Sequence, residues 1–89
     1  MNDFAERIEE LAKDLNTERE KLRVQLHLAK MEASDEWQDL EEKFSRFESK
    51  TEELGGAAAE ASKEIAEAAK LLGQEIAEGF KKVANKLKD

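Results

Sequence analysis

The sequence predicts an all-α protein: an antiparallel helical hairpin, coiled-coil-like, that assembles into a helical bundle. Three observations lead to this prediction. Ala, Glu, Lys, Leu and Arg supply more than half of the 89 residues, a composition typical of long helices and coiled coils. Pro is absent and only four Gly occur, so few positions interrupt a helix. Apolar residues recur at intervals of three and four, and no stretch alternates with a period of two.

The first predicted element spans residues 1–54, and its apolar positions follow one face of a helix. A break near Asn16 and Thr17 is an open alternative, because Thr17 followed by Glu20 has the form of a capping box. Ser34 and Asp35 also resemble a helix cap, but they lie within a regular part of the apolar pattern. We therefore expect either one helix through Ser34 or a helix pair that breaks near residues 16–17.

The turn is predicted at Gly55 and Gly56, because glycine costs about 1 kcal/mol relative to alanine inside a helix and is preferred where a helix ends. The second arm spans residues 57–88 and repeats the apolar pattern. A second line of small residues lies beside its bulky ones, so this arm is expected to contact two neighbours. Folding at the glycines would place Trp37 near Leu72, Gly73 and Ile76.

We call the bulky residues of this pattern the apolar stripe and predict that it mediates self-association or partner binding. Residues 1–21 would overhang a hairpin of residues 22–89, so their apolar residues need cover. Either the segment folds back at Asn16 as a third helix, or hairpins associate into a homodimer or homotetramer, which we favour because one hairpin offers little core. The stripe consists of Phe4, Ile8, Leu11, Leu15, Leu22, Leu26, Trp37, Leu40, Phe44, Phe47, Leu54, Ile65, Leu72, Ile76, Phe80, Val83 and Leu87.

The sequence contains no catalytic or metal-binding pattern. His27 has no acidic or histidine partner at the preceding or following helical turn, where a metal site would need one. Carboxylate pairs such as Asp35 with Asp39 lie on a charged face, whereas a catalytic pair needs two different environments. No cysteine, nucleophile elbow or phosphate-binding loop occurs. We therefore expect no enzyme activity, no cofactor and no metal.

The run from Ala33 to Leu40, with Leu22 before it and an alanine-rich second arm that ends in lysines, resembles the small uncharacterised bacterial coiled-coil proteins. In that group a Ser, acid, Trp, acid, Leu run follows a charged helix. The resemblance covers roughly residues 20–88. It implies a self-associating helical hairpin and no site residues.

The composition limits the classes of partner. With 22 acidic and 15 basic residues the net charge is −7, which disfavours nucleic acid because phosphates must be neutralised by Lys and Arg. No apolar run would form a signal peptide or a membrane span, so a cytoplasmic location is expected. The leading interpretation is a structural or interaction protein that associates through the apolar stripe, alone or with an unidentified protein partner.

Two alternatives remain open at this stage. The second arm, with Lys81, Lys82, Lys86 and Lys88 beside its apolar face, is similar to an amphipathic helix that lies on an anionic membrane, so the chain could be a peripheral lipid-binding protein. The segment from Phe4 to Leu15 could instead dock on a larger protein, which would make the chain a small adaptor.

Overall fold

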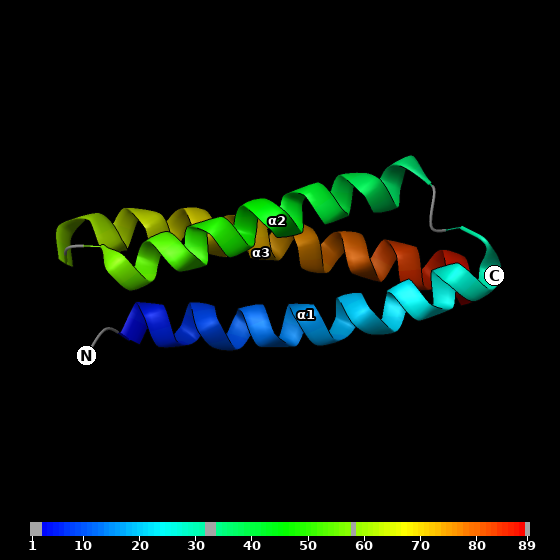
Figure 1. The fold of residues 1–89 in the computed structure, drawn as a ribbon, viewed down its shortest axis with the longest axis horizontal. Coiled ribbons are helices and arrows are strands. Elements are labelled where there is room, and N and C mark those ends of the chain that lie inside the picture. Colours follow the sequence, from blue (N-terminus) through cyan, green and yellow to red (C-terminus); the bar gives the residue numbers. More distant parts are fainter. Residues whose placement is uncertain (1–2, 32–33, 58, 89) are drawn as a thin grey trace.

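The computed structural model is a three-helix bundle, and it describes residues 3–31, 34–57 and 59–88, with backbone only at residues 3, 4 and 59. Helix α1 spans Asp3–Ala29, α2 spans Asp35–Gly56 and α3 spans Ala59–Lys88. The helices run up, down and up, so that α1 and α3 are parallel and α2 is antiparallel to both (Figure 1). The bundle is elongated, with principal extents of 45 × 19 × 16 Å. The predicted all-α helical bundle is confirmed, and the described residues include no strand.

Helix α1 ends at Ala29 and α2 begins at Asp35, within the stretch for which the sequence predicts one continuous helix. Lys30 has a positive φ of 59°, Met31 N donates to Leu26 O (2.8 Å) and Lys30 N donates to His27 O (3.1 Å). This pattern is a Schellman motif with lysine at the position that glycine usually occupies. Ser34 then caps α2, because its Oγ accepts a hydrogen bond from Trp37 N at 3.3 Å.

The alternative break near residues 16–17 is wrong, since α1 is continuous there. Thr17 does not cap a helix in the structure. Its Oγ1 donates to the carbonyl oxygen of Lys13 at 3.0 Å, the bond that a threonine inside a helix makes to the preceding turn. Of the two predicted ways to cover the apolar residues of the N-terminal segment, the chain adopts the first, because it folds back to form a third helix. The fold-back occurs about fifteen residues later than Asn16.

The chain also reverses beside Gly55 and Gly56, although these glycines are the last two residues of α2 and not the turn itself. Neither has a positive φ, and Ala57, the C-cap that follows them, is extended with φ −83° and ψ 150°. This later reversal shifts the pairing of α2 with α3. Trp37 stacks on Phe80 with ring centroids 5.8 Å apart, so the predicted position of Trp37 beside Leu72 and Gly73 is wrong.

The apolar stripe forms the core of this single chain. Helix α1 packs along the α2–α3 hairpin, so residues 3–21 do not overhang it as predicted (Figure 1). The buried members of the stripe are Ile8, Leu15, Leu22, Leu26, Trp37, Leu40, Phe44, Phe47, Leu54, Ile76, Phe80 and Val83. The partly buried members are Leu11, Ile65, Leu72 and Leu87, and the side chain of Phe4 lies outside the described residues.

Helix α3 contacts both other helices, as its line of small residues predicted. Ser62, Ala66 and Ala69 are buried on this line. At Gly73 an added Cβ would lie 2.7 Å from Leu11 Cδ2, and at Gly79 it would collide with Leu40 Cδ2. Small residues therefore let α1 and α2 approach α3 closely, from two sides.

Candidate interaction surface

The residues that the sequence assigned to binding are largely inaccessible in the closed bundle. Of the N-terminal segment, Ile8 and Leu15 are buried, and of the apolar face of α3, Ile76, Phe80 and Val83 are buried. Contact of either set with a second chain or with lipid would thus require the helices to separate. Only outward-facing side chains are available to a partner while the bundle is closed.

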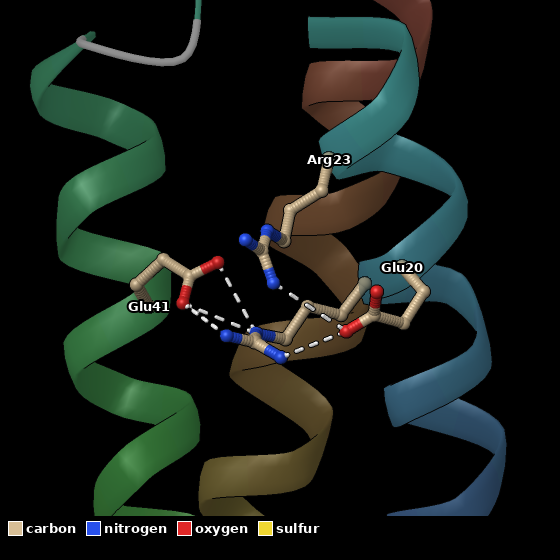
Figure 2. Close-up of polar contacts among 4 residues, drawn as sticks. Glu20, Arg23 and Glu41 are labelled. Carbon is tan, nitrogen blue, oxygen red and sulfur yellow. Dashed lines mark hydrogen bonds and ion pairs between the residues drawn. The ribbon is translucent and has the colours of Figure 1, made fainter. Parts of the chain in front are cut away.

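A polar cluster ties α1 to α2 halfway along the bundle. Arg19 Nη2 donates to Glu41 Oε2 at 2.7 Å, and Arg19 Nε lies 3.1 Å from both carboxylate oxygens. Its Nη1 pairs with Glu20 at 3.3 Å, and Arg23 pairs with the same Glu20 oxygen at 3.6 Å. Figure 2 shows Glu20 and Arg23 on α1 and Glu41 across from them on α2.

The environment of Arg19 favours its charged form. The hydrogen bond to Glu41 raises the pKa of the guanidinium, and the negative charges of Glu41, Glu20 and Glu48 act in the same direction, against partial burial, which lowers it. The guanidinium also lies over the ring of Phe44, 5.1 Å from its centroid. Arginine is already protonated at every ordinary pH. Arg19 is therefore a fixed positive charge that links α1 to α2, and not a proton donor.

Sequence reasoning did not predict this link. Arg19 and Glu41 are 22 residues apart, and they meet only because the chain folds back between α1 and α2. A pairing rule that searches one helical turn would find only neighbours such as Asp39 with Lys43, which do pair at 3.5 Å. Without the position of the break, nothing in the sequence connects Arg19 to Glu41.

Large apolar side chains outside the stripe remain exposed. Leu28 is 77% exposed, Leu71 63% and Val24 60%. Val24 and Leu28 lie one turn apart on the outer side of α1. An apolar residue off the buried face of an amphipathic helix is free to contact a partner, so the position of Val24 and Leu28 outside the stripe is the sequence signal for this surface.

Two hollows lie between α1 and α3, one toward each end of the pair, and we call them together the α1–α3 groove. The hollow at the C-terminal ends of the two helices has a volume of about 580 Å³, and the one nearer their N-terminal ends about 310 Å³. The first is lined by Glu18, Lys21, Leu22, Gln25, Leu28, Ala29, Ala84, Leu87 and Lys88. The second is lined by Arg7, Ile8, Leu11, Ala66, Glu67 and Lys70.

The charge of this groove is opposite to that of the protein as a whole. Its two hollows are lined by four basic residues and two acidic ones, although the chain carries a net charge of −7. A hollow between α2 and α3 has the reverse balance, with four acidic and two basic residues: Glu36, Asp39, Lys43, Glu75, Glu78 and Lys82. The α1–α3 groove thus combines apolar walls with a locally positive rim.

Among the described residues no three His, Cys, Asp or Glu side chains lie together in a group that could hold a metal ion. Within the same part of the chain, none of the three helices is both long enough and apolar enough to cross a membrane.

Comparison of the chain with protein-family models, with curated proteins and with solved structures gave no match. The resemblance to small bacterial helical-hairpin proteins therefore rests on the sequence pattern alone. Any functional conclusion has to come from the bundle and its surface.

Proposed function

We propose that this chain is a helical interaction protein that binds a macromolecular partner through the outside of a closed three-helix bundle. The proposal rests on the way the apolar residues of the chain are divided between the core and the surface. Most of the stripe is buried in the core of one chain, while Val24, Leu28 and the α1–α3 groove remain open to solvent. In this interpretation the buried part of the stripe is structural, and the groove, which the partly buried Leu11 and Leu87 border, is the binding surface.

Self-association through the stripe stays a prediction, and it requires exchange of helices between copies. Because Phe47, Ile76 and Leu26 are among the most deeply buried residues, such an exchange would expose the whole core before new contacts form. A closed monomer needs no such step. The geometry therefore supports partner binding by the outer surface better than pairing of stripes.

The test is the solution mass measured by light scattering over a dilution series, with circular dichroism on the same samples. We expect a strongly helical monomer whose helicity does not change on dilution. A dimer or tetramer that loses helicity as it dissociates would contradict the proposal, because the stripe would then be buried between chains.

A surface variant provides an independent check. The double substitution Val24→Glu and Leu28→Glu should leave the free energy of unfolding within about 0.5 kcal/mol of the original, as expected for exposed positions. The matched core variant Leu26→Ala should lose about 3 kcal/mol. Equal losses in the two variants would show that the outer face of α1 is buried in solution.

A further inference from the structure

We infer that the α1–α3 groove binds an acidic amphipathic helix of a partner protein, which would complete a four-helix bundle. This inference rests on the proposed function and names the surface and the chemistry of the partner. It starts from the arrangement of the two helices. Helices α1 and α3 are parallel, and α2 packs against both of them (Figure 1). The hollows between α1 and α3 mark a fourth position in the bundle, which none of the described helices fills.

The size of the groove fits a helix. Its lining on α1 runs from Arg7 to Ala29, and its lining on α3 runs from Ala66 to Lys88. A stretch of about 22 helical residues is about 33 Å long at 1.5 Å per residue. A partner helix of about 20 residues would therefore contact both hollows at once.

Apolar contacts are available at both ends of the groove. Leu28, which is 77% exposed, and the partly buried Leu87 border the larger hollow, and the partly buried Leu11 borders the smaller one. Ala66 and Ala84 lie on the α3 wall at the two hollows, and their small side chains leave room for a close neighbour. Leucines spaced three and four residues apart on the partner would fill these positions.

The charges select an acidic partner. Arg7 and Lys70 flank the smaller hollow, and Lys21 and Lys88 flank the larger one, so glutamates near both ends of the bound helix would be paired. A second copy of this chain fits less well, because its own groove has the same positive rim. A membrane fits less well too, since a flat surface does not enter a groove between two helices.

The experiment uses two synthetic peptides of about 20 residues with leucine at positions i, i+3, i+4 and i+7. The acidic probe has glutamates at the flanking positions, and the basic probe has lysines there instead. Each is titrated into the isotope-labelled full chain, and binding is followed by NMR. We expect saturable shifts at Leu11, Leu28, Ala84 and Leu87 with the acidic probe only, and weaker binding as salt is added.

Charge-reversal variants locate the site. Lys21→Glu with Lys70→Glu should weaken binding of the acidic probe about tenfold or more. The control, Lys50→Glu with Lys82→Glu, makes the same change of net charge at hollows between α2 and α3 and should change the affinity less than about threefold. Circular dichroism of both variants confirms that each remains folded.

Three results would overturn the inference. The first is that the acidic and basic probes bind equally well. The second is that the two pairs of charge reversals weaken binding of the acidic probe equally. The third is that neither probe causes a saturable shift in a chain that light scattering finds to be a closed monomer. The last result would leave the proposed function standing without this partner. Dimer formation that Leu28→Glu abolishes would assign the groove to a second copy, and flotation of the chain with anionic vesicles that Lys21→Glu with Lys70→Glu abolishes would assign it to a membrane.

Discussion

The four glycines of this chain form two pairs that differ in the space around them. Gly55 and Gly56 end α2, and a methyl group at either position would meet no atom within 4 Å. Gly73 and Gly79 lie inside α3, where a methyl group would meet a leucine of another helix. No glycine of the four has a positive φ. The conformational freedom for which glycine is selected in turns is therefore used at none of them.

The comparison shows that glycine in a helical protein can indicate two different features, the end of a helix or a close contact between helices. An adjacent pair weakens the helix locally and predicts that it ends there, which is nearly correct for α2. An isolated glycine inside a regular pattern signals close approach of a neighbour. Which helix makes that close contact depends on the packing, so an isolated glycine can be interpreted only when the packing is known.

The largest effect is expected at Gly79. Its added Cβ would collide with Leu40 Cδ2 and would also lie 3.2 Å from Leu40 Cδ1 and Cγ, so the whole end of a buried leucine must move. Gly79→Ala should lower the free energy of unfolding by about 2 kcal/mol, since overpacking outweighs the gain in helix propensity. Urea unfolding followed by circular dichroism measures it.

The control for Gly79 is a double-mutant cycle with Leu40→Ala. Once the leucine is shortened, the added methyl group has room, and the alanine at position 79 should cost nothing or stabilise the helix. If Gly79→Ala costs as much in the Leu40→Ala background as in the original chain, the collision is not the cause.

Gly55→Ala combined with Gly56→Ala should have the opposite sign. Both positions are helical and open, so alanine removes the entropic cost of glycine without a clash, and stability should rise by about 1.5 kcal/mol. Thermal and urea unfolding would both report the gain. A loss of stability would mean that the reversal into α3 needs a conformation that only glycine adopts.

Local sequence signals are also insufficient to locate helix ends, as Ser34 and Thr17 show. Both resemble an N-cap in the sequence, but only Ser34 Oγ accepts a bond from a backbone N–H. Ser34→Ala should therefore cost about 1 kcal/mol. Thr17→Ala, inside α1, should be neutral or stabilise by a few tenths, and urea unfolding of the two variants side by side would show whether they differ.

The sequence was sufficient for the helical class and for most of the core, because a three-four spacing is a local property and it alone determines which face is apolar. It was not sufficient for the position of the first break. Lys30 ends α1 in a left-handed conformation that a rule based on glycine does not detect, and the stripe continues in phase across the gap. From that one missed break followed the predicted overhang of residues 1–21.

The missed break between α1 and α2 is also the reason why the sequence does not predict the candidate site. With residues 1–54 read as one helix, Arg19 and Glu41 would lie about 33 Å apart at 1.5 Å per residue, and no groove between two parallel helices could be foreseen. Only after α1 folds back do Leu28 and Leu87 border one hollow. Most residues of the predicted binding stripe form the core, and the groove is bordered by Leu28, which lies outside the stripe, together with the partly buried stripe residues Leu11 and Leu87.

The smallest effect is expected at Gly73, although it lies inside α3 like Gly79. Its Cβ would lie 2.7 Å from Leu11 Cδ2, but Leu11 is only partly buried and borders the open groove, so its methyl group can swing outward. Phe47, 3.3 Å away and fully buried, has to yield slightly. The helix propensity of alanine offsets this strain, and Gly73→Ala should change stability by less than about 0.5 kcal/mol. A loss as large as that of Gly79→Ala would mean that Leu11 is held in place, and the groove it borders would then be tighter than an open site for a partner helix requires.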